Sequence, residues 1–503
     1  MKINIIGAGM AGLAAGCYLQ MKGFETEIFE SQSKAGGLCS SWKKGAYTFD
    51  GCLHWLLGSA KSNPFYKLWS ELIDMDSVQF VNHDTRVDIE LKNNKDKNGN
   101  TVFHLFTNLE KLKEYMYGIS PVDKRHIMKF INSVRRLQKF EIPPMIEEVP
   151  MLLSWKDKMK YIKHLPLLIY LFKWRNITNF TFAAKFKDPF LKEAFQLFFD
   201  GDEMPLIIMS MPLANYDTKS AGYPIGGSSV FMKKFEDRYN SLGGKIRFNS
   251  EVKKIITENN SAKSLELMNG TRVLSDITVS AADWHETVFK ALEGKYIDKT
   301  IIQLGKEEKL PVFYSVFMIS LGVGRSFDHQ PHMFRFPIPG ELISPDGTKY
   351  QRLELHTYNY DPTLAPRGKT VLTLSLYTKK GDFWIDLRKS QPEKYKECKQ
   401  EFANQIIEIL DHKLGNIKSN IEEMDIATPA TFHRYTGNWK GSVQGWLPGK
   451  KLLAMPPVGF ELPGLKNFYY CGHWSVPGGG LPIAVKSARD VAKIICKTNK
   501  VPF

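Results

Sequence analysis

A glycine-rich segment near residue 7 narrows the folds open to this chain more than any other feature. Residues 2–6 form a short apolar run, which predicts a buried parallel strand. Apolar residues recur at helical spacing from Met10 to Met21, which predicts a helix. The turn between them has the pattern G-x-G-x-x-G and consists of Gly7, Ala8, Gly9, Met10, Ala11 and Gly12. Between a strand and a helix, this pattern indicates a dinucleotide-binding β-α-β unit.

Each glycine of this pattern has its own physical reason. The first permits the tight turn, the second lets the backbone approach a pyrophosphate, and the third lets helix and strand pack closely. The helix N-terminus offers free N–H groups and a positive dipole end to the anion. Glu30 closes the second predicted strand, where a carboxylate receives ribose hydroxyls and disfavours NADP. A tight turn in an α/β protein that binds no nucleotide is the alternative.

Two further glycine groups favour FAD over NAD. Gly36 and Gly37 follow the acidic strand end, and Gly472 with residues 478–480 lies in the last part of the chain. A dinucleotide held by one β-α-β unit needs neither group. A flavin dinucleotide lies extended, so its far end has to be held by chain from elsewhere. We therefore expect the dinucleotide fold to be completed by the glycines near residue 480.

Length and composition indicate a globular protein of two or three domains, with 503 residues, 43% hydrophobic and 24% charged. The net charge of +15 indicates a solvated basic surface, or attraction to anionic lipid headgroups or a phosphate-bearing ligand. We expect no nucleic-acid partner, because the sequence has no nucleic-acid module and no dense basic run with interleaved aromatics. The six cysteines show no C-x-x-C pair and no zinc spacing, so we expect free thiols, a reducing compartment and no metal.

Residues 156–175 are the part of the chain most suited to a membrane surface. They mix Lys and Arg with large apolar residues, which is typical of an amphipathic helix in the interface; a helix packed on the protein is the alternative. The apolar stretch 165–172 is far shorter than the roughly 20 residues of a membrane span. Since no signal peptide precedes the glycine motif, we expect a cytoplasmic protein, in solution or peripheral on the inner face of the membrane.

The middle of the chain changes from helical to strand-like patterns. Residues 107–215 are mostly helical and read as an insertion, with Thr107 and Glu110 as a predicted capping box at its start. Asn269-Gly270 between two apolar segments predicts a hairpin turn. Residues 310–380 alternate as strands, and 393–414 form a helix.

Taken in order, these motifs resemble the phytoene desaturase and carotenoid isomerase family of flavoproteins, within the larger amine-oxidase-like superfamily. The matching segments are residues 7–12 with Glu30, 36–37, 47–51, 223–227, 243–252 and 470–480. The likeness is weakest in residues 85–215 and 295–440. The sequence departs from the family at Leu38, where a basic residue is frequent, and at His473, where an acidic or small one is usual. Residues 50–55 also resemble the polyamine-oxidase form of this strand.

The resemblance implies an α/β fold of two interleaved parts. A Rossmann-type FAD-binding domain with a parallel sheet is interrupted by an α+β substrate domain with a mixed or antiparallel sheet and a helical insertion. We place the FAD-binding domain in residues 1–84, 222–294 and 455–503. The substrate-binding domain then takes residues 85–221 and 295–454, with a helical region at 107–215 that could face a membrane.

The resemblance also implies which residues hold FAD noncovalently. Val252 is expected near the adenine, and Gly36 and Gly37 along the pyrophosphate and ribityl chain. Gly472 and the start of the last helix are expected to face the flavin, because a helix N-terminus stabilises the negative charge of its reduced form. The full expected set is Gly7, Gly9, Met10, Ala11, Gly12, Glu30, Gly36, Gly37, Leu38, His54, Trp55, Val252, Gly472, His473, Leu481 and Pro482.

The implied reaction is hydride transfer between an apolar polyene or isoprenoid and flavin N5, in a desaturase, saturase or isomerase. The cofactor carries the hard step, and the protein aligns and desolvates the substrate. His54 and His473 are the candidate catalytic residues, with hydrogen-bonded structural histidines as the alternative. Trp55 and Trp474 either border the flavin or fill the core. Asp50 is expected to cap a turn.

Two other functions fit parts of the sequence. An amine-oxidase-like enzyme for a small amine would need a polar pocket of carboxylates and aromatics. A non-enzymatic isoprenoid-binding protein of the GDP-dissociation-inhibitor type would keep the fold without using flavin, and the intact glycine triplet with Glu30 argues against it. Apolar residues at 195–199 and 204–211 are predicted to line a tunnel for an apolar substrate or to form plain core.

Overall fold

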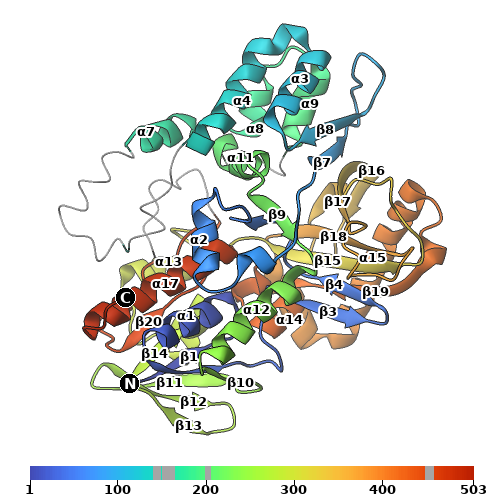
Figure 1. Ribbon diagram of the computed structural model, residues 1–503. Helices are drawn as coiled ribbons and strands as arrows, with labels where there is room; N and C mark the ends of the chain where they lie inside the picture. Colours follow the sequence, from blue (N-terminus) through green and yellow to red (C-terminus); the bar gives the residue numbers. More distant parts are fainter. Residues whose placement is uncertain (140–148, 150–164, 199–204, 448–457) are drawn as a thin grey trace.

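The structure, a computed structural model, describes residues 1–139, 149, 165–198, 205–447 and 458–503. The predicted membrane-surface segment lies outside the described residues up to residue 164, and so do Phe199 and Met204 of the two apolar runs. Figure 1 shows a parallel sheet near both ends of the chain, a larger second sheet beside it, and a group of helices above that second sheet.

Three distant parts of the chain build one five-stranded parallel sheet, in the order β10-β2-β1-β14-β20. Its strands are β1 (Lys2–Ile6), β2 (Glu25–Phe29), β10 (Lys245–Arg247), β14 (Ile277–Ser280) and β20 (Phe468–Tyr470). Because all five run parallel, their carboxyl ends meet at one edge of the sheet. Ligands of open α/β sheets bind at this edge.

Both faces of the parallel sheet are covered, as a parallel sheet requires. Helices α1 (Met10–Met21), α12 (Gly227–Ser241) and α17 (Leu481–Thr498) share one apolar core with the inward side chains of one face, such as Ile5 and Val279. The other face packs against an antiparallel sheet of β11 (Val252–Glu258), β12 (Ser261–Leu267) and β13 (Arg272–Leu274). α1 lies between α12 and α17 (Figure 1).

The turn between β1 and α1 needs its glycines for two different reasons. Gly7 has φ +94, in the left-handed region that glycine adopts without strain. A Cβ placed on Gly12 would lie 1.9 Å from the carbonyl oxygen of Gly7. Helix and strand thus approach as closely as two backbones can, which is the packing role predicted for the third glycine.

A seven-stranded mixed sheet forms the second large layer, in the order β19-β15-β18-β17-β16-β7-β8. One face packs on helices α14 (Gly381–Ser390), α15 (Pro392–Leu414) and α16 (Pro429–Thr436). Only the β7–β16 pair within it is parallel. The strands are β7 (Thr85–Glu90), β8 (Val102–Phe106), β15 (Ser315–Val323), β16 (Met333–Ile343), β17 (Lys349–Thr357), β18 (Thr370–Thr378) and β19 (Ile421–Ala427).

The group of helices packs on β7 and β8 through a core rich in phenylalanine. It contains α3 (Leu109–Ile119), α4 (Lys124–Lys139), α7 (Leu165–Trp174), α8 (Asn179–Ala183), α9 (Pro189–Gln196), α10 (Leu206–Met209) and α11 (Met211–Asp217).

The smaller elements are β3 (Ser41–Lys44), β4 (Tyr47–Asp50), β5 (Leu56–Leu57), β6 (Phe80–Val81), β9 (Ala221–Pro224), α2 (Pro64–Ser70), α13 (Lys299–Gly305), η1 (Met75–Ser77), η2 (Pro121–Asp123), η5 (Glu286–Ala291), η6 (Lys418–Asn420) and η7 (Trp439–Gly441).

The structure confirms the predicted fold class: an α/β protein with a parallel sheet, a mixed second sheet and a helical insertion. The Asn269-Gly270 turn joins β12 to β13, with Gly270 at φ +83. The predicted capping box is wrong, because Asn108 rather than Thr107 caps α3 and accepts the Lys111 N–H at 2.8 Å. Phe195 and Phe198 belong to the helical core. The domain limits stay a prediction.

Alanine at Gly12 tests the close approach of α1 and β1. We expect Gly12→Ala to lower the free energy of unfolding by roughly 2 kcal/mol or more, since its Cβ would meet backbone that has no room to move. The measurement is urea unfolding followed by circular dichroism. Gly118→Ala in α3 is the matched control: nothing lies within 4 Å of its Cβ position, and we expect unchanged stability or a gain of up to about 1 kcal/mol. A Gly12→Ala protein as stable as wild type contradicts this account.

Candidate functional site

The first glycine turn and Glu30 are tied together by hydrogen bonds. Ala8 N–H donates to Glu30 Oε2 at 2.7 Å, and Gln32 N–H donates to Oε1 at 2.9 Å. Glu30 is 7% exposed although it is a carboxylate, so these donors replace part of its water. The carboxylate therefore lies beside the turn at the carboxyl ends of β1 and β2, where the sequence predicted it.

The second glycine pair contacts the first glycine turn directly. Gly36 N–H donates to the Ala8 carbonyl at 3.0 Å, and Gly36 forms a bridge with Gly9. Gly36 and Gly37 have φ of +134 and +58, which other residues adopt only with strain. Leu38, next along the chain, packs against an apolar group that includes Val316 of β15. The two glycine segments that the sequence singled out therefore lie in direct contact.

The C-terminal glycines reach the same edge of the sheet. Gly472 follows β20, and a Cβ built on it would lie 3.9 Å from the Cβ of Ala11 in the first turn of α1. Its N–H donates to Ser487 Oγ of α17 at 2.9 Å. Residues 478–480 all have positive φ and lead into α17, where Leu481 and Pro482 form the first turn. Segments near the two ends of the chain thus lie together at the carboxyl edge of the parallel sheet.

The remaining side of this site comes from the start of β11. Ser250 N–H donates to the Glu30 carbonyl at 2.8 Å. Val252 packs in the apolar cluster that contains Ile6 and Phe29, the last residues of β1 and β2. Val252 therefore lies beside the strand ends, on the face opposite α1.

These residues fit an extended anionic dinucleotide. The first turn of α1 contains no acidic residue, so its N–H groups meet no competing carboxylate there. A Cβ on Gly9 would have only Gly36 O and Gly37 Cα near it, both at 4.0 Å, so a side chain there would fill the space above the turn. Nε2 of His473 and Nε1 of Trp474 are buried with no hydrogen-bond partner among the described residues, which a polar ligand could supply.

The two candidate histidines lie in different surroundings. His54 Nδ1 is 3.2 Å from the Tyr358 hydroxyl, and its ring centroid is 4.3 Å from that of His356 on β17. Burial, aided by the charge of His356, lowers the pKa of His54 to about 3. His473 lies beside Trp474, and burial lowers its pKa to about 4. Both imidazoles are therefore neutral at pH 7.

Asp50 caps a turn, as predicted, and also joins two elements. It is fully buried and accepts from the N–H groups of Cys52 and Leu53 at 2.8 and 3.1 Å. Ser228 at the start of α12 donates to it through both its N–H and its hydroxyl. Burial raises the pKa of the Asp50 carboxyl, and these donors oppose the rise. Asp50 thus positions the chain that leads to His54.

Trp55 and Trp474 differ in burial. Trp474 is 1% exposed and packs with other tryptophans, which favours the core alternative for it. Trp55 is partly exposed, and its ring centroid is 5.9 Å from that of Tyr216 on α11.

The sequence interpretation missed a polar cluster next to His54. His83 stacks on His332 with centroids 3.6 Å apart, and His356 Nε2 is 3.2 Å from Glu354 Oε1. The signal was present in β17. Leu353 and Leu355 face the core, and the alternating residues Arg352, Glu354 and His356 are charged or titratable. We call this set the histidine–arginine cluster; it consists of His54, His83, Arg86, Tyr216, His332, Glu354 and His356.

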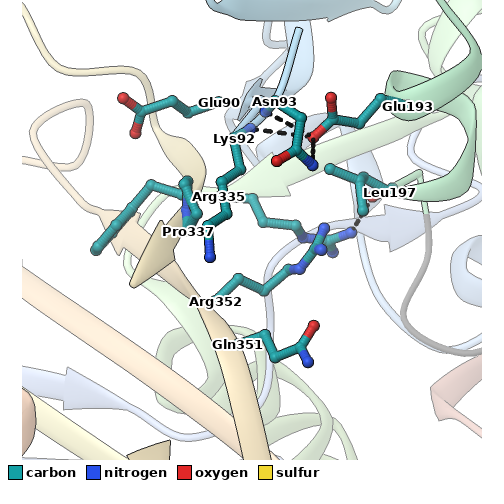
Figure 2. Close-up of a pocket in the computed structure, with 10 residues that line it drawn as sticks. Glu90, Lys92, Asn93, Glu193, Leu197, Arg335, Pro337, Gln351 and Arg352 are labelled. Atoms are coloured by element: carbon teal, nitrogen blue, oxygen red, sulfur yellow. Dashed lines mark hydrogen bonds between the residues drawn. The ribbon is translucent and has the colours of Figure 1, made fainter. Parts of the chain in front are cut away.

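A shallow cleft opens on the neighbouring part of β7 and β16, shown in Figure 2. Several of its charged groups are already paired. Glu193 accepts from Lys92 N–H at 3.1 Å and from Asn93, and Arg335 donates to the Leu197 carbonyl at 2.5 Å and to Glu354. It lies on β7, β16, β17 and α9, away from the glycine turns. We therefore interpret it as a surface cleft rather than the active site.

Comparison with known proteins identifies the family. The pattern defining the flavin-containing amine oxidoreductases matches residues 10–496, so the chain belongs to that family. Across its full length, and 96% of the relative, the chain is 23% identical to a 4,4'-diapophytoene desaturase (4,4'-diapolycopene-forming) from Methylomonas sp.. It is 26% identical to prolycopene isomerase 2, chloroplastic, from an Oncidium hybrid cultivar, covering 95% of this chain and 80% of that one. An oxidoreductase structure from Methanosarcina mazei shares the fold, with TM-score 0.62, 17% identity and coverage of 98% and 100%.

The buried neutral histidines predict a loss of stability on mild acidification. The folded His473 has a pKa of about 4, whereas an imidazole in the unfolded chain titrates near 6.5. Between these values the unfolded state binds more protons, so the contribution to stability is present above pH 6.5 and decreases as the pH falls toward 4. We expect His473→Gln to reduce the pH slope of the free energy of unfolding by up to about 1.4 kcal/mol per pH unit in this window.

The measurement is urea unfolding at a series of pH values. Other titrating groups contribute alike to both proteins, so the difference isolates His473. His329→Gln, at an exposed histidine, is the control and should leave the slope unchanged. Equal slopes for wild type and His473→Gln would contradict this prediction. They would show that the pKa of His473 does not differ between the folded and unfolded chain.

Proposed function

We propose that this protein is an FAD-dependent oxidoreductase that transfers hydride between an apolar polyene or isoprenoid and the flavin, as a desaturase, saturase or isomerase. One observation carries the proposal: the Gly472 turn lies against Ala11 at the start of α1, with 3.9 Å between their Cβ positions. Two distant parts of the chain therefore bound one extended site at the strand ends. Full-length similarity to a diapophytoene desaturase and a prolycopene isomerase supports the substrate class.

In this proposal the glycine turns bind the cofactor and the histidines serve the substrate side. The N–H groups at the start of α1 hold the pyrophosphate, Glu30 the ribose, and Val252 the adenine. The start of α17 faces the flavin ring. Residues 1–84, 222–294 and 455–503 then form the FAD-binding domain, and 85–221 with 295–454 form the substrate domain. Bound flavin supplies the hydride acceptor.

His54 and His473 are proposed to border the reacting carbons as neutral imidazoles. Both are only partly exposed, and desolvation lowers their pKa values to about 3 and 4, which makes them weak bases. A weak base suffices after hydride loss, because a substrate cation gives up its neighbouring proton readily. Their burial also excludes water, which would otherwise add to the cation. Asp50 and Tyr358 position His54 for this role.

The amine alternative is disfavoured by the charge beside His54. A small amine is a cation at neutral pH and needs carboxylates or aromatic faces around it. The one carboxylate in the histidine–arginine cluster, Glu354, is paired with Arg335 and His356. Arg86 adds a positive charge to the same surroundings, as its effect on the pKa of His54 indicates. This arrangement would repel an ammonium group.

An absorption spectrum of freshly purified protein, with its organic extract, tests the proposal. We expect flavin bands, release of FAD on denaturation, and a polyene in the extract. Gly9→Val should raise the dissociation constant for FAD about tenfold or more, because its side chain would enter the open space above the turn, and about 1.4 kcal/mol of lost binding already gives tenfold. Circular dichroism checks that the variant folds.

The outcomes separate the three functions. Purified protein without flavin, even after incubation with FAD, would favour a lipid-binding protein of the GDP-dissociation-inhibitor type. Flavin with amine-dependent peroxide production would sink the polyene proposal and favour an amine oxidase. A wild-type dissociation constant for FAD in Gly9→Val would show that the cofactor lies elsewhere than above this turn.

We also propose that α7 contacts a membrane, which would let an apolar substrate enter. None of the helices in the described residues combines the length and apolar character of a bilayer span. On α7, Tyr170 and Trp174 are buried, and large apolar side chains are half-exposed on the other side: Leu165, Leu168, Ile169 and Phe172 at 50, 51, 59 and 58%. Arg175 stacks on Phe172, so a cation adjoins this apolar face. Such a surface fits an anionic lipid interface.

Vesicle cosedimentation tests this contact. We expect the triple variant Leu168→Ser, Ile169→Ser, Phe172→Ser to weaken binding to anionic phospholipid vesicles about tenfold or more, since each apolar side chain withdrawn from water contributes on the order of 1.5–3 kcal/mol. Leu274→Ser on β13, 76% exposed in wild type, is the control for loss of an exposed apolar residue elsewhere. Equal binding of the triple variant and wild type would rule out α7 as the contact.

A further inference from the structure

We propose that Arg86 binds a carboxylate on the substrate, so that the polyene or isoprenoid taken by this protein is an acid rather than a plain hydrocarbon. The inference rests on the proposed function and names its substrate class more closely. It starts from the histidine–arginine cluster, where Arg86 forms no ion pair with any carboxylate in the part of the chain that the structure describes.

Arg86 lies at an irregularity in β7. Thr85 pairs with Phe106 and Val87 with Leu105, so Arg86 is the extra residue of a β-bulge. A bulge turns a side chain out of the regular alternation of a strand, and bulges are frequent beside active sites. Here the guanidinium carbon lies 5.8 Å from the ring centroid of Tyr216 on α11. The side chain therefore points toward the helices that cover β7.

Two nitrogens of the Arg86 guanidinium lack acceptors, although the side chain also interacts with the Tyr216 hydroxyl. Its Nε and Nη1 atoms are buried and have no hydrogen-bond partner among the described residues. The ring and hydroxyl of Tyr216 attract the cation and are neutral, so they supply no counter-charge. A buried cation without a counter-charge is strongly unfavourable, because it loses its water and gains nothing comparable. A ligand with a planar pair of anionic oxygens would satisfy both N–H groups together.

The contrast with Arg335 shows what Arg86 is missing. Arg335 lies on β16, which pairs with β7, and is 7% exposed. Its guanidinium donates to Glu354 and to the Leu197 carbonyl, the second contact being visible in Figure 2. The same sheet thus gives Arg335 acceptors, whereas Nε and Nη1 of Arg86 have none among the described residues. Asp88, two residues beyond Arg86, lies 3.0 Å from His104 instead.

Two histidines near Arg86, His83 and His332, supply hydrogen-bonding groups and have lowered pKa values. Burial lowers the pKa of His83 to about 4. Burial and the charges of His83, His356 and Arg86 hold the pKa of His332 well below its usual value. His83 Nε2 is also buried without a partner among the described residues. At neutral pH the Arg86 cation therefore lies near the neutral imidazoles of His83 and His332, which can hydrogen-bond the same oxygens.

The cluster also adjoins the predicted flavin side. Tyr216 contacts Trp55, and Trp55 follows His54 in the chain. An acid held at Arg86 would have its apolar chain beside these aromatic rings. The expected ligand is thus an apolar, unsaturated chain that ends in a carboxylate.

Binding of a matched pair of ligands to the holoprotein tests the inference. The probes are all-trans-retinoic acid and its methyl ester, which carry the same polyene and differ in charge. Quenching of protein fluorescence gives the dissociation constants. We expect wild type to bind the acid about tenfold or more tightly than the ester, as a charge-assisted pair in a buried site allows. Arg86→Gln should remove that preference and leave ester binding unchanged, and Arg86→Lys should keep part of it.

Arg325→Gln is the matched control. It also removes one arginine charge, but its guanidinium donates to the carbonyls of Leu414 and Gly415 outside the cluster. It should keep the preference for the acid. Equal affinity of wild type for acid and ester overturns the inference, and so does an equal loss of both in a folded Arg86→Gln protein.

Two readouts on the same preparations separate this inference from the proposed function. Flavin content reports on the proposed function alone: protein with flavin but no preference for the acid refutes only the role of Arg86. The flavin reduction potential is measured without ligand. A shift in Arg86→Gln with the acid preference intact would assign the guanidinium to the flavin instead of the substrate, and overturn the inference.

Discussion

The close packing of α1 on the end of β1 decides how the candidate site is assembled. A Cβ on Gly12 would lie 1.9 Å from the Gly7 carbonyl oxygen, so helix and strand meet at backbone distance. This approach holds the N-terminus of α1 at the carboxyl edge of the parallel sheet. Gly36 then hydrogen-bonds Ala8, and Gly472 lies beside Ala11. Since α12 and α17 pack on either side of α1, segments from the beginning, middle and end of the chain meet at one helix terminus.

Several charged and titratable groups of the interior follow one rule, from which Arg86 departs. Asp50 is surrounded by donors, Arg335 is paired with Glu354, and the buried histidines stay neutral because burial lowers their pKa values. Each of these avoids an uncompensated charge in a desolvated place. Arg86 is the exception, with two buried donors open. In a family of flavin oxidoreductases, such an exception beside the candidate active site is more readily explained by a ligand than by the fold.

Much of the fold could be predicted because it rests on local patterns. The glycine turn, Glu30 at the end of β2, the Asn269-Gly270 hairpin and α15 each depend on residues close together in the chain. The cap of α3 was assigned one residue too early, since Thr107 and Asn108 are both good capping residues and only the geometry of the turn selects Asn108. The histidine–arginine cluster was missed because its members come from distant positions in the chain, and several, such as Arg86 and Glu354, lie in the stretches where the family resemblance is weakest.

The sequence by itself determined the elements of the candidate site, since each glycine is required by a backbone conformation or a close approach that neighbouring residues already specify. It also determined the predicted family, through the order of those motifs. Only the tertiary structure decided that Gly36 and Gly472 lie against the first turn, and which charges in the second sheet have partners. The physical reason is that pairing and burial depend on contacts between residues far apart in the chain, whereas turns and caps depend on residues next to one another.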